Sequence, residues 1–342
     1  MKKVSYAWID FLKGLSIFAV VFDHLYGLVY KNESLHLLTE FSVTTFIFLA
    51  GITSVISIDR NKLPLWAYQK RRAKAILVPY AVATAIYVIV NLQYTFDLRI
   101  YWNSLLSFNA SPPFYFIVFF LELILIAPYM YKLINNTKIW VHLLCLVLMY
   151  IVSKYLTHNT LVGDIYGGGG RILGGSYLFV FFLGMLFYTH YKRFESTSPK
   201  AWLLTIGIIF SFVATYLLCL AGWLNLGWTN PPNKYTIIYS LIIVIWGYSL
   251  FGLLQKSKLG KIVGSIVTTL GRYSLYIFLY HLLAIFYITK ILNYSMIKYG
   301  LTSSILILVF ALTTPLLIGY LTKSRTKLIN SEQFKKWFLK RR

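Results

Sequence analysis

Residues Trp8–Val29 read WIDFLKGLSIFAVVFDHLYGLV, an apolar run that contains ionisable side chains. A helix of roughly 20 apolar residues is long enough to cross the hydrocarbon core of a bilayer. The run nevertheless includes Asp10, Lys13, Asp23 and His24. Ionisable groups inside a membrane span are costly and usually serve a function. The stretch therefore predicts a first membrane helix that also carries part of a functional site.

The helical period places Lys13 and His24 on nearly the same stripe of this helix. They are eleven residues apart, and each residue turns the helix by about 100°. Asp10 falls within roughly 60° of that stripe, close enough to Lys13 to pair with it. Asp10 lies about 20 Å from His24 along the axis, and Asp23 points about 100° away from His24. Any group that orients His24 is therefore expected on another helix.

Composition predicts an all-α polytopic membrane helix bundle. Hydrophobic residues make up 58% of the 342 residues and charged residues 13%, whereas a soluble domain has roughly 25% charged residues. We expect a membrane domain over residues 1–322, a basic tail over 323–342, and about ten spans. The expected spans are 8–29, 41–58, 76–95, 112–131, 139–157, 173–191, 201–222, 236–254, 272–292 and 302–322.

The apolar run from Ile262 to Leu292 is too long for one span. Three glycines, Gly260, Gly264 and Gly271, are expected to break it, which predicts an interfacial helix leading into the ninth span.

The net charge of +23 follows from membrane topology. With both termini in the cytoplasm, most Lys and Arg residues fall in inner segments, as the positive-inside rule requires. The outer segments keep only Lys31, Arg99, Lys154, Arg171, Lys234, Lys290 and Lys298. The charge is thus explained by topology and by attraction to membrane lipid in a cell membrane, without a nucleic-acid partner.

Several kinds of chemistry have no motif here. The two cysteines, Cys145 and Cys219, lie in apolar runs and imply no disulfide framework. The sequence has no GxSxG, Walker, HExxH or Cys/His metal spacing. Any catalysis is expected to use histidine and carboxylate groups, with no metal and no serine nucleophile.

His24 is the leading candidate for catalysis. An apolar environment disfavours the charged form of histidine, so a neutral His24 could act as a general base. The alternative is a structural histidine that bonds a neighbouring helix. Asp10 and Glu122 are the candidate carboxylates, and Glu122 would need a partner such as a histidine or Lys13.

A second histidine, His281, lies in the run LGRYSLYIFLYHLL with Arg272 and Ser274. Ser274 and His281 are seven residues apart, so they share one helical face. Each could simply make an interhelical hydrogen bond. Alternatively, a second buried histidine indicates a polar reaction path through the bundle.

A dense basic cluster, Lys70, Arg71, Arg72 and Lys74, opens the third predicted span. It could reflect topology alone. It could also bind phosphates, where Arg gives bidentate contacts. Coenzyme A and anionic lipid headgroups are both suitable ligands.

Five motifs along the chain resemble the membrane acyltransferase type 3 family, in its sugar O-acetylase branch. They are WIDFLKGLSIFAVVFDH, FIFLAGI, KRRAKAILVPY, PPFYFIVFFLELILIAPYM and LGRYSLYIFLYH. The resemblance implies ten spans and acyl transfer from cytoplasmic acyl-CoA to a glycan hydroxyl. It implies that His24 is the essential histidine and Arg72 the first residue of a basic motif. This chain has Ala75 where the family has the second basic residue, and Phe278 where it has tyrosine.

The sequence thus leads to one hypothesis and two alternatives. The hypothesis is an integral membrane O-acyltransferase that uses acetyl-CoA or another acyl-CoA on a cell-surface glycan or a lipid-linked saccharide, together with other glycan-pathway proteins. Its candidate catalytic residues are His24, Asp10, Glu122 and His281. Its candidate donor-binding residues are Lys13, Lys70, Arg71, Arg72, Lys74, Arg272 and Ser274. The alternatives are a polysaccharide exporter or flippase, and a non-catalytic subunit of a glycan synthesis complex.

Overall fold

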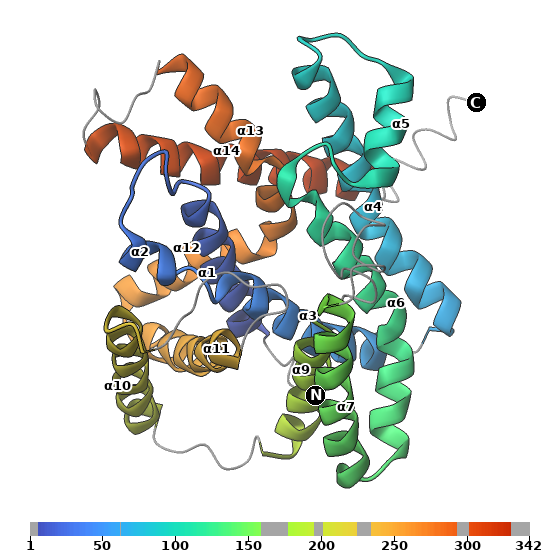
Figure 1. Ribbon diagram of the computed structural model, residues 1–342, viewed down its shortest axis with the longest axis vertical. Coiled ribbons are helices and arrows are strands. Elements are labelled where there is room, and N and C mark those ends of the chain that lie inside the picture. Colours follow the sequence, from blue (N-terminus) through green and yellow to red (C-terminus); the bar gives the residue numbers. More distant parts are fainter. Residues whose placement is uncertain are drawn as a thin grey trace.

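The computed structural model describes residues 6–61, 63–158, 177–194, 201–223, 234–292 and 301–329. The named elements within these residues are all helices (Figure 1). The expected all-α fold is therefore confirmed.

The helices follow one another along the whole described chain. They are α1 (Ala7–Asp23), α2 (Glu33–Leu37), α3 (Ser42–Asn61), α4 (Leu65–Asn91), α5 (Leu98–Ser107), η1 (Pro112–Phe114), α6 (Tyr115–Asn136), α7 (Ile139–His158), α9 (Leu178–Phe194), α10 (Ala201–Leu220), α11 (Lys234–Leu254), α12 (Lys258–Arg272), α13 (Ser274–Ile291) and α14 (Leu301–Ile329).

Each range that the sequence predicts as a span contains a helix, although α1 ends at Asp23 where the first predicted span runs to residue 29. Within the described residues, six helical segments are long and apolar enough to cross a membrane: Glu33–Arg60, Leu65–Asn91, Pro112–Asn136, Lys234–Leu254, Ser274–Ile291 and Thr302–Ser324. In a bilayer, only helices and closed barrels can satisfy their own backbone hydrogen bonds. The chain is therefore a multi-pass helical membrane protein, and the number of spans and the side of each terminus stay predictions.

α1 lies at the centre of the bundle, where it packs against α3, α11, α12, α13 and α14 (Figure 1). Its closest neighbour is α12. A Cβ atom at Gly14 would overlap the main-chain carbonyl of Val267, and one at Gly271 would overlap that of Asp10. The two backbones can approach this closely only because both positions lack side chains.

The sequence correctly predicts a separate helix ahead of α13. α12 ends at Arg272 and the chain turns at Tyr273, next to Gly271 and to the predicted start of the ninth span at residue 272. Gly260 and Gly264, which were also expected to break the run, lie inside α12 on its covered side and do not interrupt it. Buried small residues at such positions favour close helix packing in membranes.

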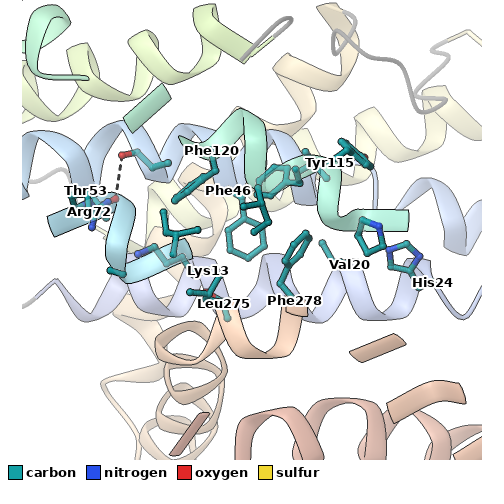
Figure 2. Close-up of a pocket in the computed structure, with 18 residues that line it drawn as sticks. Lys13, Val20, His24, Phe46, Thr53, Arg72, Tyr115, Phe120, Leu275 and Phe278 are labelled. Atoms are coloured by element: carbon teal, nitrogen blue, oxygen red, sulfur yellow. Dashed lines mark hydrogen bonds between the residues drawn. The ribbon is translucent and has the colours of Figure 1, made fainter. Parts of the chain in front are cut away.

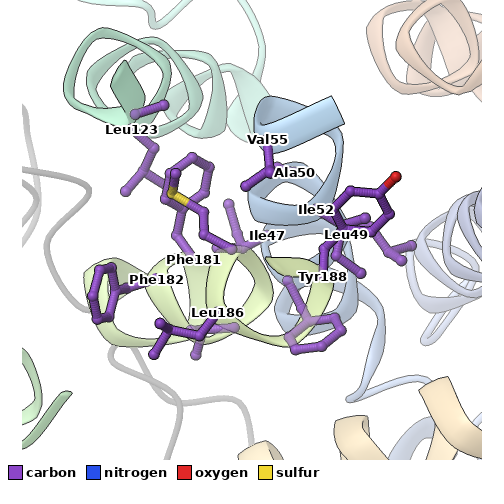
Figure 3. Packing of buried hydrophobic residues seen from close by; sticks show 14 of the residues in the cluster. Ile47, Leu49, Ala50, Ile52, Val55, Leu123, Phe181, Phe182, Leu186 and Tyr188 are labelled. Carbon is purple, nitrogen blue, oxygen red and sulfur yellow. The ribbon is translucent and has the colours of Figure 1, made fainter. Parts of the chain in front are cut away.

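Apolar side chains form both the interior and much of the surface. A buried cluster joins α3, α6 and α9 through residues that include Ile47, Leu123 and Phe181 (Figure 3). Large apolar residues such as Trp140 and Phe210 are about three-quarters exposed. In a membrane protein, such a surface faces lipid.

Candidate active site

A single cavity of about 300 Å³ contains both polar residues that share the stripe of α1, Lys13 and His24. They are separated by about 16 Å along the helix axis. Figure 2 shows Lys13 and Arg72 at one end of the cavity and His24 at the other. The polar face predicted for the first helix therefore looks into the protein.

Five helices, α1, α3, α4, α6 and α13, and η1 build the cavity wall. Between its two polar ends the wall is mainly apolar, with the rings of Phe46, Phe116, Phe120 and Phe278. An apolar wall keeps water out and strengthens the electrostatic interactions at both ends. The polar side chains of the lining are Lys13, His24, Thr53, Arg72, Tyr115 and Ser274.

The cationic end lacks a balancing carboxylate in the cavity lining. Asp10, which is outside the lining, makes an ion pair with Arg272 (Nε to Oδ2, 3.5 Å) and also interacts electrostatically with Lys13. The Nε atom of Arg72 is buried and has no hydrogen-bond partner in the described part of the chain. Buried cations are costly unless they are paired, so this end of the cavity is suited to a bound anion.

Lys323 of α14 adds a further positive charge close to this end. Its ammonium group donates a hydrogen bond of 2.7 Å to the main-chain carbonyl of Arg272. It also lies 4.4 Å from the centre of the Tyr273 ring, in a cation–π contact. The sequence analysis did not select Lys323, because it follows the last span among many other basic residues.

His24 follows the last residue of α1, and its main-chain N–H donates to the carbonyl of Val20 (3.2 Å). The neighbouring carboxylate, Asp23, accepts a hydrogen bond from Thr39 (2.9 Å) and lies 3.0 Å from Nδ1 of His36. The ring of His281, from α13, lies beside His24 with 5.0 Å between ring centroids. The structure thus brings together two histidines that are far apart in the sequence.

Apart from Arg72 and Ser274, the remaining predicted residues lie outside the cavity lining. Lys70, Arg71 and Lys74 are exposed on α4, whereas Arg72 is half-buried and lines the cavity. Glu122 is half-buried on α6 and is not among the lining residues. Of the donor-binding candidates, the cavity therefore gathers Lys13, Arg72 and Ser274.

The apolar lining was not predicted residue by residue. Phe46 belongs to the motif FIFLAGI, and Tyr115, Phe116 and Phe120 belong to PPFYFIVFF. No spacing distinguishes these rings from the many other aromatic residues of the chain. Membership in the two motifs is the one signal that could have identified them.

A family model confirms the family that the motifs indicate, and the sugar O-acetylase branch stays a prediction. The acyltransferase 3 model, described as an acyltransferase domain, matches residues 6–323. No curated protein and no solved structure shows detectable similarity to the chain. The family match includes all five helices that line the cavity and nearly the whole sequence. The chain is therefore a membrane acyltransferase and belongs to the acyltransferase 3 family.

Proposed function

We propose that this enzyme transfers an acyl group, acetyl in the simplest case, from acyl-CoA to a hydroxyl group of a cell-surface glycan or a lipid-linked saccharide. The observation that carries the proposal is the single cavity that joins the cations Lys13 and Arg72 to His24. An acyl-CoA has phosphates at one end and a thioester at the end of a long, largely uncharged arm. The cavity matches this order, because its cations could bind the phosphates and His24 lies at the end where the thioester would be.

The cationic end would hold phosphates of the donor. Arg72 supplies a buried guanidinium Nε that lacks a partner in the described chain, and guanidinium groups bind phosphate with directed hydrogen bonds. Lys13 adds a second charge on the opposite wall. The distance from Lys13 to His24 along the helix axis, about 16 Å, is comparable to the length of an extended phosphopantetheine arm. That arm would lie between the phenylalanine rings.

His24 would act as the general base. It takes the proton from the acceptor hydroxyl while the hydroxyl oxygen attacks the thioester carbonyl carbon. The C–O ester bond forms, the C–S bond breaks, and His24 returns its proton to the departing thiolate of coenzyme A. Holding both reactants in one water-poor cavity contributes through proximity.

The proposed setting is the cell membrane, with both termini in the cytoplasm and the cationic end facing the cytoplasmic donor. The glycan would approach the His24 end. Proteins of the glycan pathway are proposed partners that supply the acceptor.

The test is acyl transfer by the purified protein in lipid, with acetyl-CoA and candidate glycans. His24→Ala should lower turnover by at least about 100-fold, the usual contribution of a general base. The matched control is His36→Ala, because His36 contacts Asp23 and does not line the cavity. Turnover that survives in His24→Ala would refute the mechanism. A wild-type protein that binds no acyl-CoA and releases no thiol would favour the exporter or the non-catalytic subunit.

A further inference from the structure

The ring of His281 lies beside the proposed base but does not line the cavity. Its side chain is 0% exposed, and its ring centroid is 5.0 Å from that of His24. The two residues come from different helices, since His24 follows α1 and His281 lies within α13. The mechanism above gives His281 no role.

The surroundings of His281 determine which of its nitrogens carries the proton. Nδ1 lies 3.0 Å from the main-chain oxygen of Ile277 and 2.9 Å from that of Phe278. A carbonyl oxygen can only accept a hydrogen bond, so Nδ1 must be the N–H group. In the neutral ring, the lone pair is therefore on Nε2.

Nε2 of His281 is an unsatisfied buried acceptor. It is inaccessible to solvent and has no hydrogen-bond partner in the described part of the chain. Buried polar atoms without a partner are rare and need an explanation. A hydrogen-bond donor directed at this atom would explain it.

His24 is placed to supply that donor. Because ring nitrogens lie at the edge of each imidazole, rings with centroids 5.0 Å apart can turn two nitrogens to about 2.9 Å, a normal hydrogen-bond distance. His24 is half-buried and lines open space, so its ring can rotate.

Asp23, the carboxylate nearest in sequence, is committed elsewhere. Its Oδ1 accepts a hydrogen bond from Thr39 and lies 3.0 Å from Nδ1 of His36. It therefore does not supply the fixed acceptor that commonly orients a catalytic histidine.

We infer that Nε2 of His281 accepts a hydrogen bond from a ring N–H of His24 and so positions the base. The inference rests on the proposed function, because it assigns the group that orients the proposed base. The bond fixes the tautomer of His24 and leaves its other nitrogen unprotonated, facing the cavity. When His24 gains a proton, the bond becomes charge-assisted and stronger.

His281 is a positioning residue and not a second base. It is fully buried and outside the cavity lining, so it touches neither substrate. Its Nδ1–H is held by helix carbonyls, so it has no route to pass a proton onward.

Two conservative variants separate this role from a structural one. The side-chain amide of Gln reaches the place of Nε2, whereas that of Asn reaches the place of Nδ1. His281→Gln should keep acyl transfer within about threefold of the wild type, because it retains the acceptor. His281→Asn and His281→Leu should lower kcat by about 10- to 100-fold, the range found when a hydrogen-bond partner that orients a metal-binding histidine is removed, with the KM for acetyl-CoA unchanged. Activity that survives in His281→Asn but not in His281→Gln would overturn the inference.

A second measurement depends neither on turnover nor on variants that fold. Solid-state NMR of wild-type protein with ¹⁵N-labelled histidine, in lipid, should show His281 protonated at Nδ1 and His24 in one tautomer, with its N–H coupled to Nε2 of His281. Two tautomers of His24, or no coupling, would overturn the inference even if all His281 variants are inactive. If acetyl-CoA is not a substrate, the proposed function fails while the NMR result still decides the pairing.

Discussion

Replacing Arg72 by methionine should weaken donor binding without weakening the fold. The Nε atom of Arg72 is buried and unpaired in the described chain, and Lys13 lines the same end of the cavity. Arg72 makes no ion pair within the described residues, so removing its guanidinium breaks none there, and it removes a charge that is costly to bury. Arg72→Met should therefore unfold at the same temperature as the wild type or higher.

The loss appears when the donor binds. A hydrogen bond to a charged group contributes about 1.5–3 kcal/mol, which corresponds to about 10- to 150-fold in affinity. We expect the Kd of coenzyme A to rise by that factor in Arg72→Met. The KM for acetyl-CoA should rise in parallel and kcat should change little, because the phosphate contact is the same in the ground and transition states.

The matched control is Lys74→Met, two residues further along α4. It removes the same formal charge from the same basic cluster, but Lys74 is exposed and outside the cavity lining. Exposed charges contribute at most about 1 kcal/mol, so its Kd should change by less than about fivefold. Equilibrium titration with coenzyme A in lipid nanodiscs and initial rates with acetyl-CoA measure both quantities. A Lys74→Met defect equal to that of Arg72→Met would refute the assignment of the cavity as the phosphate site.

Three further substitutions test the fold and the cavity. Gly271→Ala places a Cβ on the Asp10 carbonyl and should lower the free energy of unfolding by about 1–3 kcal/mol. In the control variant Gly252→Ala the new Cβ meets open space, so the protein should not be destabilised. Equal unfolding temperatures for the two variants would contradict the close packing of α1 on α12. Phe278→Ala enlarges the cavity and should raise the preference for butyryl-CoA over acetyl-CoA by about tenfold, since each buried CH₂ contributes about 0.8 kcal/mol. A competition assay with both donors measures this preference. An unchanged ratio of the two products would place the acyl group elsewhere. Asp10→Asn removes a partly exposed ion pair and should keep turnover within about fivefold of the wild type. A loss of turnover above about 100-fold in the acyl-transfer assay would show that Asp10 is catalytic.

The sequence carried the information that depends on a single helix. The 3.6-residue period alone placed Lys13 and His24 on one stripe, and both line the same cavity. The apolar runs likewise located the helices, because a helix in lipid must satisfy its own backbone.

Contacts between helices could not be predicted in the same way. α4 is apolar on most of its surface, so its sequence does not reveal that Arg72 faces inward while Lys70 and Lys74 face outward. The pairing of Asp10 with Arg272 depends on how α12 packs on α1. The contact between the rings of His24 and His281 depends on the packing of α13.

Glycine was a mixed signal. In water-soluble helices it often marks an end, and α12 does end close to Gly271, but Gly260 and Gly264 lie within α12 and do not interrupt it. In this bundle Gly14 and Gly271 allow two backbones to touch, so the same residue type marks a contact within a continuous helix.

α1 fixes the distance between the two polar ends of the cavity. Both ends of the cavity are attached to it, Lys13 within the helix and His24 directly after it, so the span between them is set by a count of residues and not by the packing of separate helices. Movements of α3, α6 or α13 during a catalytic cycle would widen or narrow the cavity and leave that span constant. One inserted residue between the two ends would turn them about 100° out of line. Changes in the walls can therefore suit new acyl groups and acceptors, whereas this geometry holds only while the spacing along this one helix stays the same.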